Sequence, residues 1–171
     1  MQEIEYYDPE SDYSIFYING NWYIDEPSKW MYDSCKIYRL DGLYHREDGP
    51  TIEYSNGNTE WYLYGVLHRL DGPAVEYSID GKEWWLNGKP HRLNGPAIED
   101  TDGSKAWYFN GVRHREDGPA IEYPDGYQEW WVNGSRHRLD GPAIEYSNGG
   151  KEWWLNNLEL TEEEFLEQCE K

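Results

Sequence analysis

The sequence predicts an all-β protein: an elongated antiparallel β-meander of 23-residue two-strand repeats, followed by a short C-terminal α-helix. Three observations carry this prediction. The chain has a fixed internal period, each period contains two short strand-like segments with turn residues between them, and the last residues begin with a helix-capping pattern. The period is marked by all five histidines, each followed by arginine, at His45, His68, His91, His114 and His137. A 23-residue unit cannot bury an apolar face by itself, so consecutive repeats are expected to stack.

Each repeat contains two predicted strands and two predicted turns. In the second repeat, residues 74–77 alternate between apolar and polar side chains, as a half-buried strand does. Residues 80–81 are Asp-Gly, a hairpin turn signal, and residues 83–86 (Glu-Trp-Trp-Leu) form the second strand. Residues 87–88 are Asn-Gly and predict another tight turn. A further glycine follows Asp or Asn in every connecting loop, and we expect it to adopt a positive φ angle; these glycines are Gly49, Gly72, Gly95, Gly118 and Gly141.

The repeats divide the chain into three predicted regions. Residues 1–44 form an N-terminal capping region with degenerate repeats, and residues 45–159 form five tandem repeats. Residues 160–171 form an acidic helix, because Thr161 is a good N-cap and three glutamates follow it. Its expected apolar side consists of Phe165, Leu166 and Cys169. The degenerate traces are the match of residues 38–42 to 84–88, the Asn-Gly at 19–20, and Pro27, which lies 23 residues before Pro50.

Composition narrows the class of protein. The formal net charge is −19, and 17% of the 171 residues are aromatic, a content too high for a disordered chain. No apolar stretch is long enough to span a membrane, and the acidic start at residues 1–5 does not resemble a secretory leader. The distant cysteines, Cys35 and Cys169, predict free thiols in a cytoplasmic protein. So acidic a chain is not expected to bind nucleic acid or an anionic membrane directly.

The negative charge is concentrated at the ends of the chain. Residues 1–33 carry −7 and residues 157–171 carry −5, which leaves −7 for the 123 residues between them. This distribution disfavours the simplest mimic of DNA, in which acidic residues would line the long repeat face. It is also what an aromatic-rich sheet needs for solubility and for protection of its edges.

The repeat resembles the MORN family. The resemblance covers residues 36–159 and rests on the 23-residue period, the Asn-Gly turn and the run of residues 88–95 (Gly-Lys-Pro-His-Arg-Leu-Asn-Gly). An arginine follows the histidine where MORN repeats usually have glycine, and this His-Arg-x-Asp-Gly-Pro-Ala type is similar to repeats of phage and giant-virus proteins. The resemblance implies an elongated β-meander that serves as a binding scaffold, and it implies no catalytic residues.

Strand alternation predicts two kinds of sheet face. The first aromatic position is Trp in every repeat, so we assign this row, together with the Ile/Val and Tyr rows, to a structural face. The second aromatic row lies beside a glutamate row on the candidate protein-binding face. This predicted site comprises Tyr62, Trp85, Tyr108, Trp131, Trp154, Glu76, Glu99, Glu122 and Glu145.

The repeated polar residues do not predict an enzyme, a metal site or a cofactor. Equivalent residues of successive repeats are expected about 10 Å apart, because they are two strand spacings from one another. Five histidines at that spacing cannot share one metal ion, since ligand distances are near 2 Å. The evenly spaced carboxylates also lack the closed pocket of a glycosidase pair. We expect the His and Arg residues to tie each connecting loop down by hydrogen bonds and by ion pairs with Asp or Glu.

The resulting functional hypothesis is a non-enzymatic protein-binding scaffold of viral or phage origin. It would bind and inhibit a host protein with a basic surface, involved in defence or nucleic-acid handling, through the aromatic and acidic face. One alternative is an acidic mimic of nucleic acid, and another is a sponge that stacks a nucleotide or sugar on its aromatic rings. The sequence leaves the oligomeric state open between a monomer and a homodimer, because the terminal helix could cover its own sheet edge or dock into a second chain.

Overall fold

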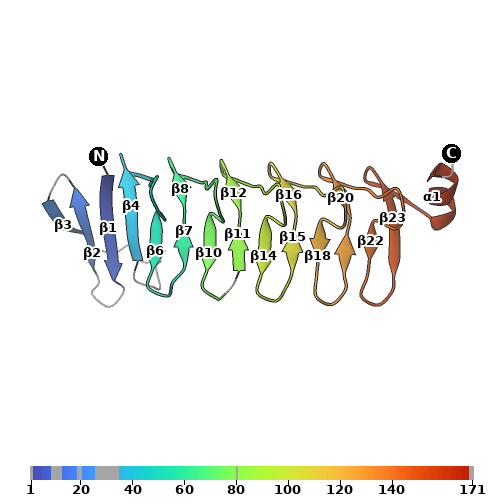
Figure 1. Ribbon diagram of the computed structural model, residues 1–171, viewed down its shortest axis with the longest axis horizontal. Coiled ribbons are helices and arrows are strands. Elements are labelled where there is room, and N and C mark those ends of the chain that lie inside the picture. The colour runs from blue at the N-terminus through green and yellow to red at the C-terminus, as the bar shows by residue number, and fades with distance from the viewer. Residues whose placement is uncertain (1, 9–12, 19–20, 26–34, 80, 170–171) are drawn as a thin grey trace. The chain divides into compact units, whose positions relative to one another are not determined.

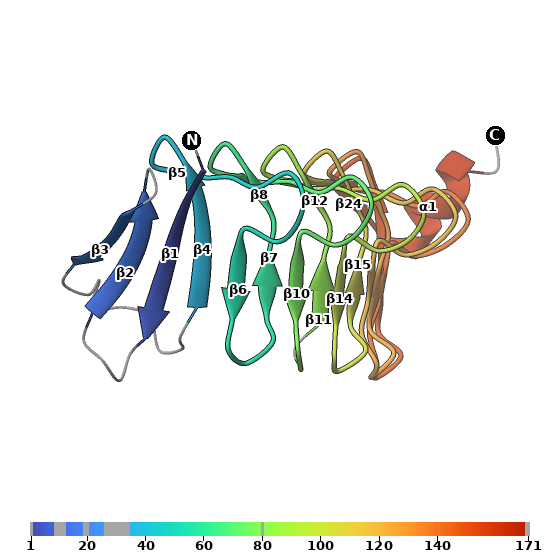
Figure 2. The ribbon, with the colours of Figure 1, turned by 60° about the vertical axis from the view of Figure 1, so that its left-hand side comes forward.

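The structure is a computed structural model that describes residues 2–8, 13–18, 21–25, 35–79 and 81–169. It has two compact units, Met1–Lys89 and Pro90–Lys171, and each is built on an antiparallel sheet (Figures 1 and 2). The predicted all-β meander with a C-terminal helix is confirmed. In the part of the chain that the structure describes, no helix is long and apolar enough to cross a membrane.

The main sheet of the first unit has the strand order β11-β10-β7-β6-β4-β1-β2-β3, with β5 paired to β4. Strand β1 lies between β4 and β2, so the simple meander begins only at β4. The strands of this unit are β1 (Gln2–Asp8), β2 (Tyr13–Ile18), β3 (Asn21–Asp25), β4 (Cys35–Leu40), β5 (Leu43–Tyr44), β6 (Ile52–Tyr54), β7 (Thr59–Glu60), β8 (Tyr62–Leu63), β9 (Val66–Leu67), β10 (Val75–Tyr77), β11 (Gly81–Glu83) and β12 (Trp85–Leu86).

The main sheet of the second unit has the order β24-β23-β22-β19-β18-β15-β14. Side hairpins β16–β17 and β20–β21 project from it. The remaining elements are β13 (Lys89–Pro90), β14 (Ile98–Asp100), β15 (Lys105–Ala106), β16 (Tyr108–Phe109), β17 (Val112–Arg113), β18 (Ile121–Glu122), β19 (Gln128–Glu129), β20 (Trp131–Val132), β21 (Ser135–Arg136), β22 (Ile144–Glu145), β23 (Lys151–Leu155), β24 (Leu158–Leu160) and α1 (Glu162–Cys169).

The second predicted strand of a repeat is broken at its first tryptophan. In the first repeat, β7 ends at Glu60 and β8 starts at Tyr62, with Trp61 between them. The reason is a change of partner: the Trp61 N–H donates to the Ala74 carbonyl, whereas β8 pairs with β9 in a side hairpin. Figure 2 shows β8 above β7, at the end of the sheet opposite the lower hairpin turns. Only the last repeat keeps one continuous strand here among the described residues, in β23.

The predicted Asn-Gly turns are confirmed. Asn87 and Gly88 have φ angles of 51° and 72°, and positive values at both central positions define the type I′ hairpin turn. Asp41 and Gly42, at the equivalent place in residues 38–42, adopt the same conformation with φ angles of 51° and 78°. The other upstream traces, at residues 19–20 and at Pro27, lie outside the described residues.

The terminal helix is confirmed, but its apolar side is narrower than predicted. The Thr161 hydroxyl accepts from the Glu164 N–H at 3.2 Å, and the Glu164 carboxylate accepts from the Thr161 N–H at 2.8 Å, which forms a capping box. Phe165 is buried, while Leu166 and Cys169 are exposed. The helix packs on β23 and β24 of its own chain. Because the helix has only eight residues, the Phe165 ring alone provides its buried contact.

Candidate binding surfaces

In four of the five connecting loops, an arginine is held by four groups at once. Arg69 Nε donates to Asp71 Oδ1 at 3.0 Å, and Nη1 donates to the Pro73 carbonyl at 3.0 Å and to Glu76 Oε1 at 2.8 Å. Its guanidinium carbon lies 3.9 Å from the centre of the Trp61 ring, within the range of a cation–π contact. We call this arrangement the arginine clamp. It joins a connecting loop, a strand of its own repeat and the aromatic strand of the preceding repeat.

The arginine clamp recurs through the repeats, which confirms that Arg ties each loop down by ion pairs. The partners keep the same sequence offsets, with the aromatic residue eight positions before the arginine. Arg46 stacks on Tyr38, so the worn upstream repeat supplies a ring at the same place. The other clamp arginines are Arg92, which contacts Pro96 and Glu99, Arg115, which stacks on Trp107, and Arg138, which stacks on Trp130.

The loop glycines have a different role from the one predicted. Among the five, only Gly95 has a positive φ angle, of 133°. A Cβ atom at Gly72 would lie 2.8 Å from the guanidinium carbon of Arg69, and one at Gly49 would lie 2.7 Å from that of Arg46. The expectation of positive φ is therefore wrong for four of the five positions. Glycine suits these positions because the clamped guanidinium lies close to the place that a Cβ atom would take.

Each histidine fastens its loop to the tight turn of the same repeat, which is Asn-Gly in three of the five repeats. His137 Nδ1 accepts a hydrogen bond from the Asn156 backbone N–H at 3.2 Å, and His91 Nδ1 accepts one from Asn110 at 3.0 Å. Since Nδ1 is the acceptor, the proton of the neutral ring is assigned to Nε2. The same bond occurs 19 residues ahead of His45, His68 and His114. Histidine thus ties down the loop as expected, although its main partner is backbone.

A second set of polar contacts lies on the face of each sheet opposite the arginine clamps. Glu129 accepts from the Tyr127 hydroxyl and from the Trp131 indole N–H, both at 2.6 Å. Glu60 likewise accepts from Tyr54 and Tyr62. We call this set the Tyr–Glu–Trp ladder: Tyr54, Glu60 and Tyr62; Tyr77, Glu83 and Trp85; Tyr127, Glu129 and Trp131; Tyr146, Glu152 and Trp154. The third repeat interrupts it, because Asp100 and Ala106 replace the tyrosine and glutamate.

The structure separates the two rows of the predicted binding site. Val75 is paired directly with Glu83, so both share a face with Trp85. The predicted glutamates instead lie with the first tryptophans and the arginine clamps on the opposite face: these are Glu76, Glu99, Glu122 and Glu145. The predicted grouping of Tyr62, Trp85, Tyr108, Trp131 and Trp154 with those glutamates is therefore wrong. Four rings of the second aromatic row do lie beside carboxylates of a different row: Tyr62, Trp85, Trp131 and Trp154. The Tyr108 hydroxyl instead accepts from Arg113 Nε at 3.3 Å.

The rings of the ladder also cover the apolar row beneath them. Tyr54 and Tyr62 pack against the buried cluster of Cys35, Ile37 and Ile52. Burial, followed by the Glu60 carboxylate, raises the pKa of both tyrosines above their ordinary value. Burial and Glu129 raise the pKa of Tyr127 in the same way. These phenols are therefore held protonated as hydrogen-bond donors.

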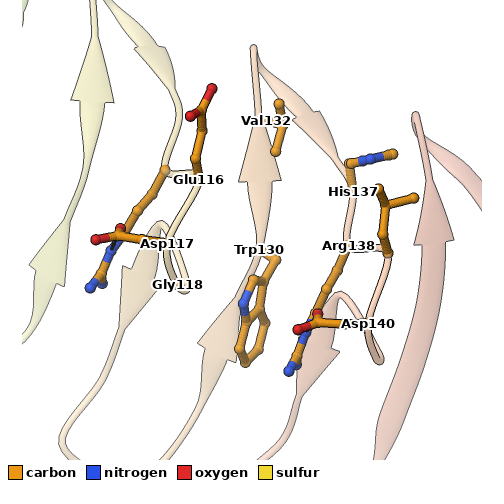
Figure 3. Close-up of a pocket in the computed structure, with 10 residues that line it drawn as sticks. Glu116, Asp117, Gly118, Trp130, Val132, His137, Arg138 and Asp140 are labelled. Atoms are coloured by element: carbon orange, nitrogen blue, oxygen red, sulfur yellow. Dashed lines mark hydrogen bonds and ion pairs between the residues drawn. The ribbon is translucent and has the colours of Figure 1, made fainter.

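Two of the pockets that the described residues form lie on the face that carries the arginine clamps. Figure 3 shows one, in which Trp130 stands between the loops that carry Asp117 and Asp140. Its volume is about 690 Å³. A second pocket of about 650 Å³ has its equivalent lining around Trp61, between the loops of Asp48 and Asp71. We call both of these loop pockets. Their volumes fall within the range of small-molecule or side-chain binding sites.

In the described part of the chain, no three His, Cys, Asp or Glu side chains form a group that could hold a metal ion. Both cysteines are free thiols, with Cys35 buried and Cys169 exposed. A scan against protein-family models found no match, and searches of curated proteins and of solved structures found no similar chain.

Proposed function

We propose that this chain is a non-enzymatic scaffold that binds another protein through the Tyr–Glu–Trp ladder. The observation that carries the proposal is the fixed orientation of the rings. In four of the five repeats, one glutamate accepts from the aromatic donors on either side of it, for example Glu129 between Tyr127 and Trp131. Rings held in this way lose little further freedom on binding, which lowers the entropic cost of an interface.

The ladder is rich in the residue types that anchor protein–protein interfaces. Tyrosine and tryptophan are enriched at binding hot spots, and several rings remain accessible, with Tyr77 and Tyr146 both 37% exposed. Each of the four ladder sets also contains a carboxylate, and those of Glu60, Glu83 and Glu152 are half-buried while that of Glu129 is buried. A partner with a basic surface would complement this row and the net charge of −19, chiefly by steering its approach.

The arrangement of charges supports this proposal over the mimic of nucleic acid. A mimic needs free carboxylates along a face, but Glu76, Glu122 and Glu145 are each within 2.9 Å of a clamp arginine. The ladder glutamates are likewise engaged by phenol and indole donors. The charges available to a partner are thus interleaved with aromatic rings, as in a protein interface rather than a row of phosphates.

The biological purpose that we propose follows from the MORN-like resemblance of the repeats to phage and giant-virus proteins. The chain would act in the cytoplasm of a host cell, where it would inhibit a defence or nucleic-acid-handling protein by covering its basic surface. Steric occlusion alone would suffice for such inhibition, so this purpose requires no catalytic group.

The test is an affinity capture from bacterial lysate with the tagged full-length chain, at low and high salt, followed by binding measurements with the purified partner. The Trp85→Ala/Trp131→Ala variant should weaken binding at least tenfold, because hot-spot aromatics typically contribute more than about 1.4 kcal/mol. Undiminished affinity in this folded variant, or the absence of any captured protein at both salt concentrations, would overturn the proposal.

Two further variants guard against misfolding. Tyr77→Ser/Tyr146→Ser removes two exposed rings of the ladder and should weaken binding without loss of the fold. Leu93→Asn alters a residue that is 75% exposed and lies outside the ladder and the two loop pockets, so its affinity should match that of the natural sequence. Circular dichroism and thermal unfolding establish that each variant is folded.

A further inference from the structure

The two loop pockets are near-identical although they lie in different units. Their ten lining residues correspond at an offset of 69 residues, which is three repeat periods, and nine of the ten are the same. The single difference is Leu63 in one pocket and Val132 in the other. In both, a loop with the sequence His-Arg-Glu-Asp-Gly faces a loop with the sequence His-Arg-Leu-Asp-Gly.

The charge within each pocket is negative despite its two arginines. Arg115 is paired with Asp117 at 2.9 Å and with Glu122 at 2.7 Å, and Arg138 has two carboxylates in the same positions. The positive charge of each arginine is thus paired with two carboxylates. Glu116 adds a further carboxylate at the rim, where its side chain is 83% exposed. Such a site disfavours anions and favours a cation.

The aromatic wall gives the site a preference for a flat group. The Arg138 guanidinium lies 3.9 Å from the centre of the Trp130 ring and covers one side of it. Figure 3 shows Trp130 standing between the two loops. A pocket that is walled by an indole ring and rimmed by carboxylates suits a planar cation with hydrogen-bond donors on its edge.

We propose that each loop pocket binds the guanidinium group of an arginine side chain from a partner protein. The plane of the guanidinium stacks on Trp130 or Trp61, and its N–H groups donate to the rim carboxylates such as Glu116 and Asp117. The aliphatic part of the arginine packs on the exposed Leu139 or Leu70. Lysine fits less well, because its ammonium is compact and strongly hydrated.

This site is distinct from the proposed protein-binding ladder. The loop pockets share the face of the arginine clamps, whereas the ladder lies on the opposite face of the sheet. The loop pockets therefore form a second recognition surface with its own chemistry, and what they bind does not depend on what the ladder binds.

The experiment titrates ¹⁵N-labelled full-length protein with three blocked tripeptides: Gly-Arg-Gly, Gly-Lys-Gly and Gly-citrulline-Gly. Citrulline is the neutral, near-isosteric analogue of arginine. The indole N–H signals of Trp61 and Trp130, assigned with the Trp61→Phe and Trp130→Phe variants, should shift with the arginine peptide, shift less with lysine and stay unchanged with citrulline. Equal shifts with citrulline, no shift with arginine, or shifts confined to Trp85 and Trp131 would overturn the proposal.

A charge-matched pair of variants tests the rim. Glu47→Gln/Glu116→Gln removes one exposed carboxylate from each loop pocket and should weaken arginine binding about two- to fivefold. Glu162→Gln/Glu163→Gln changes the net charge equally on the exposed side of α1 and should leave binding unchanged. If both pairs weaken binding alike, general charge explains the effect and the site is refuted. The Trp85→Ala/Trp131→Ala variant should retain arginine binding, which separates this test from that of the ladder.

Discussion

The guanidinium carbon of Arg138 lies 3.9 Å from the centre of the Trp130 ring while its Nη1 donates to Glu145 at 2.9 Å. These contacts join the aromatic strand of one repeat to the first strand of the next. A short repeat has little apolar surface to bury against its neighbour, and the arginine supplies flat, partly buried contact area as well as charge. The clamp therefore explains why an aspartate, a glycine and a glutamate stand at fixed offsets after the arginine, as Asp71, Gly72 and Glu76 do after Arg69.

The first prediction concerns the glycine beneath the clamp. Gly72→Ala should lower the free energy of unfolding by about 1–3 kcal/mol, the usual range for overpacking a filled site. The cause is the Cβ atom, which would lie 2.8 Å from the Arg69 guanidinium carbon and force it off its partners. Urea unfolding followed by fluorescence measures the change.

A double-mutant cycle provides the control for this prediction. In an Arg69→Ala background the clash is absent, so adding Gly72→Ala should cost only a few tenths of a kcal/mol. If the glycine substitution costs the same with and without the arginine, then backbone conformation and not the guanidinium explains why glycine is needed.

Most of the fold could be predicted because the same pattern of strand and turn residues recurs in five repeats. The Asn-Gly turns fix the hairpins, as the φ angles of 51° and 72° at Asn87 and Gly88 show. The Thr161 cap and its glutamates fix the start of the helix. The break of each aromatic strand at its first tryptophan could not be predicted, because it depends on Trp61 bonding to Ala74 of the next repeat.

Which side chains share a face of the sheet depends on the register of strand pairing, which cannot be read from the sequence. Alternation shows that Trp84 and Trp85 point to opposite sides, but it does not show which of them accompanies Val75. The pairing of Val75 with Glu83 decides the question in favour of Trp85. The offset of seven between each clamp arginine and its glutamate, as in Arg69 and Glu76, was a visible signal that this glutamate row was already paired.

The second prediction concerns the histidine row. His137→Leu should destabilise the protein by about 0.5–1.5 kcal/mol, because the Asn156 N–H loses the acceptor that it reaches at 3.2 Å. His137→Asn places an amide oxygen near the position of Nδ1 and should cost less. A shift of the urea midpoint at constant slope measures both. Equal losses in the two variants would show that ring packing, rather than this hydrogen bond, accounts for the histidine.

The third prediction concerns stability in acid. The guanidinium of the paired arginine holds the pKa of Asp48, Asp117 and Asp140 below its ordinary value. A carboxyl with a lowered pKa in the folded state stabilises that state above its unfolded pKa, near 3.9, and the stabilisation is lost as the pH falls through the folded value. The free energy of unfolding, measured from about pH 5 down to about pH 2, should therefore decrease as the pH falls. The Asp140→Asn variant should show a shallower fall, and an unchanged slope would contradict the prediction.

The fourth prediction concerns stability in alkali. The pKa of Tyr62 and of Tyr127 is raised by burial and then by the neighbouring glutamate, so the folded state favours the neutral phenols. The stabilisation is complete below the ordinary tyrosine pKa, near 10, and is lost as the pH rises above it. Absorbance titration of phenolate should show part of the tyrosines ionising only as the protein unfolds. Glu129→Gln removes the facing carboxylate and should let Tyr127 ionise at lower pH, though still above its ordinary value because the ring remains partly buried. Ionisation of every tyrosine in one step near the ordinary value, with the fold intact, would show that the ladder does not hold its phenols protonated.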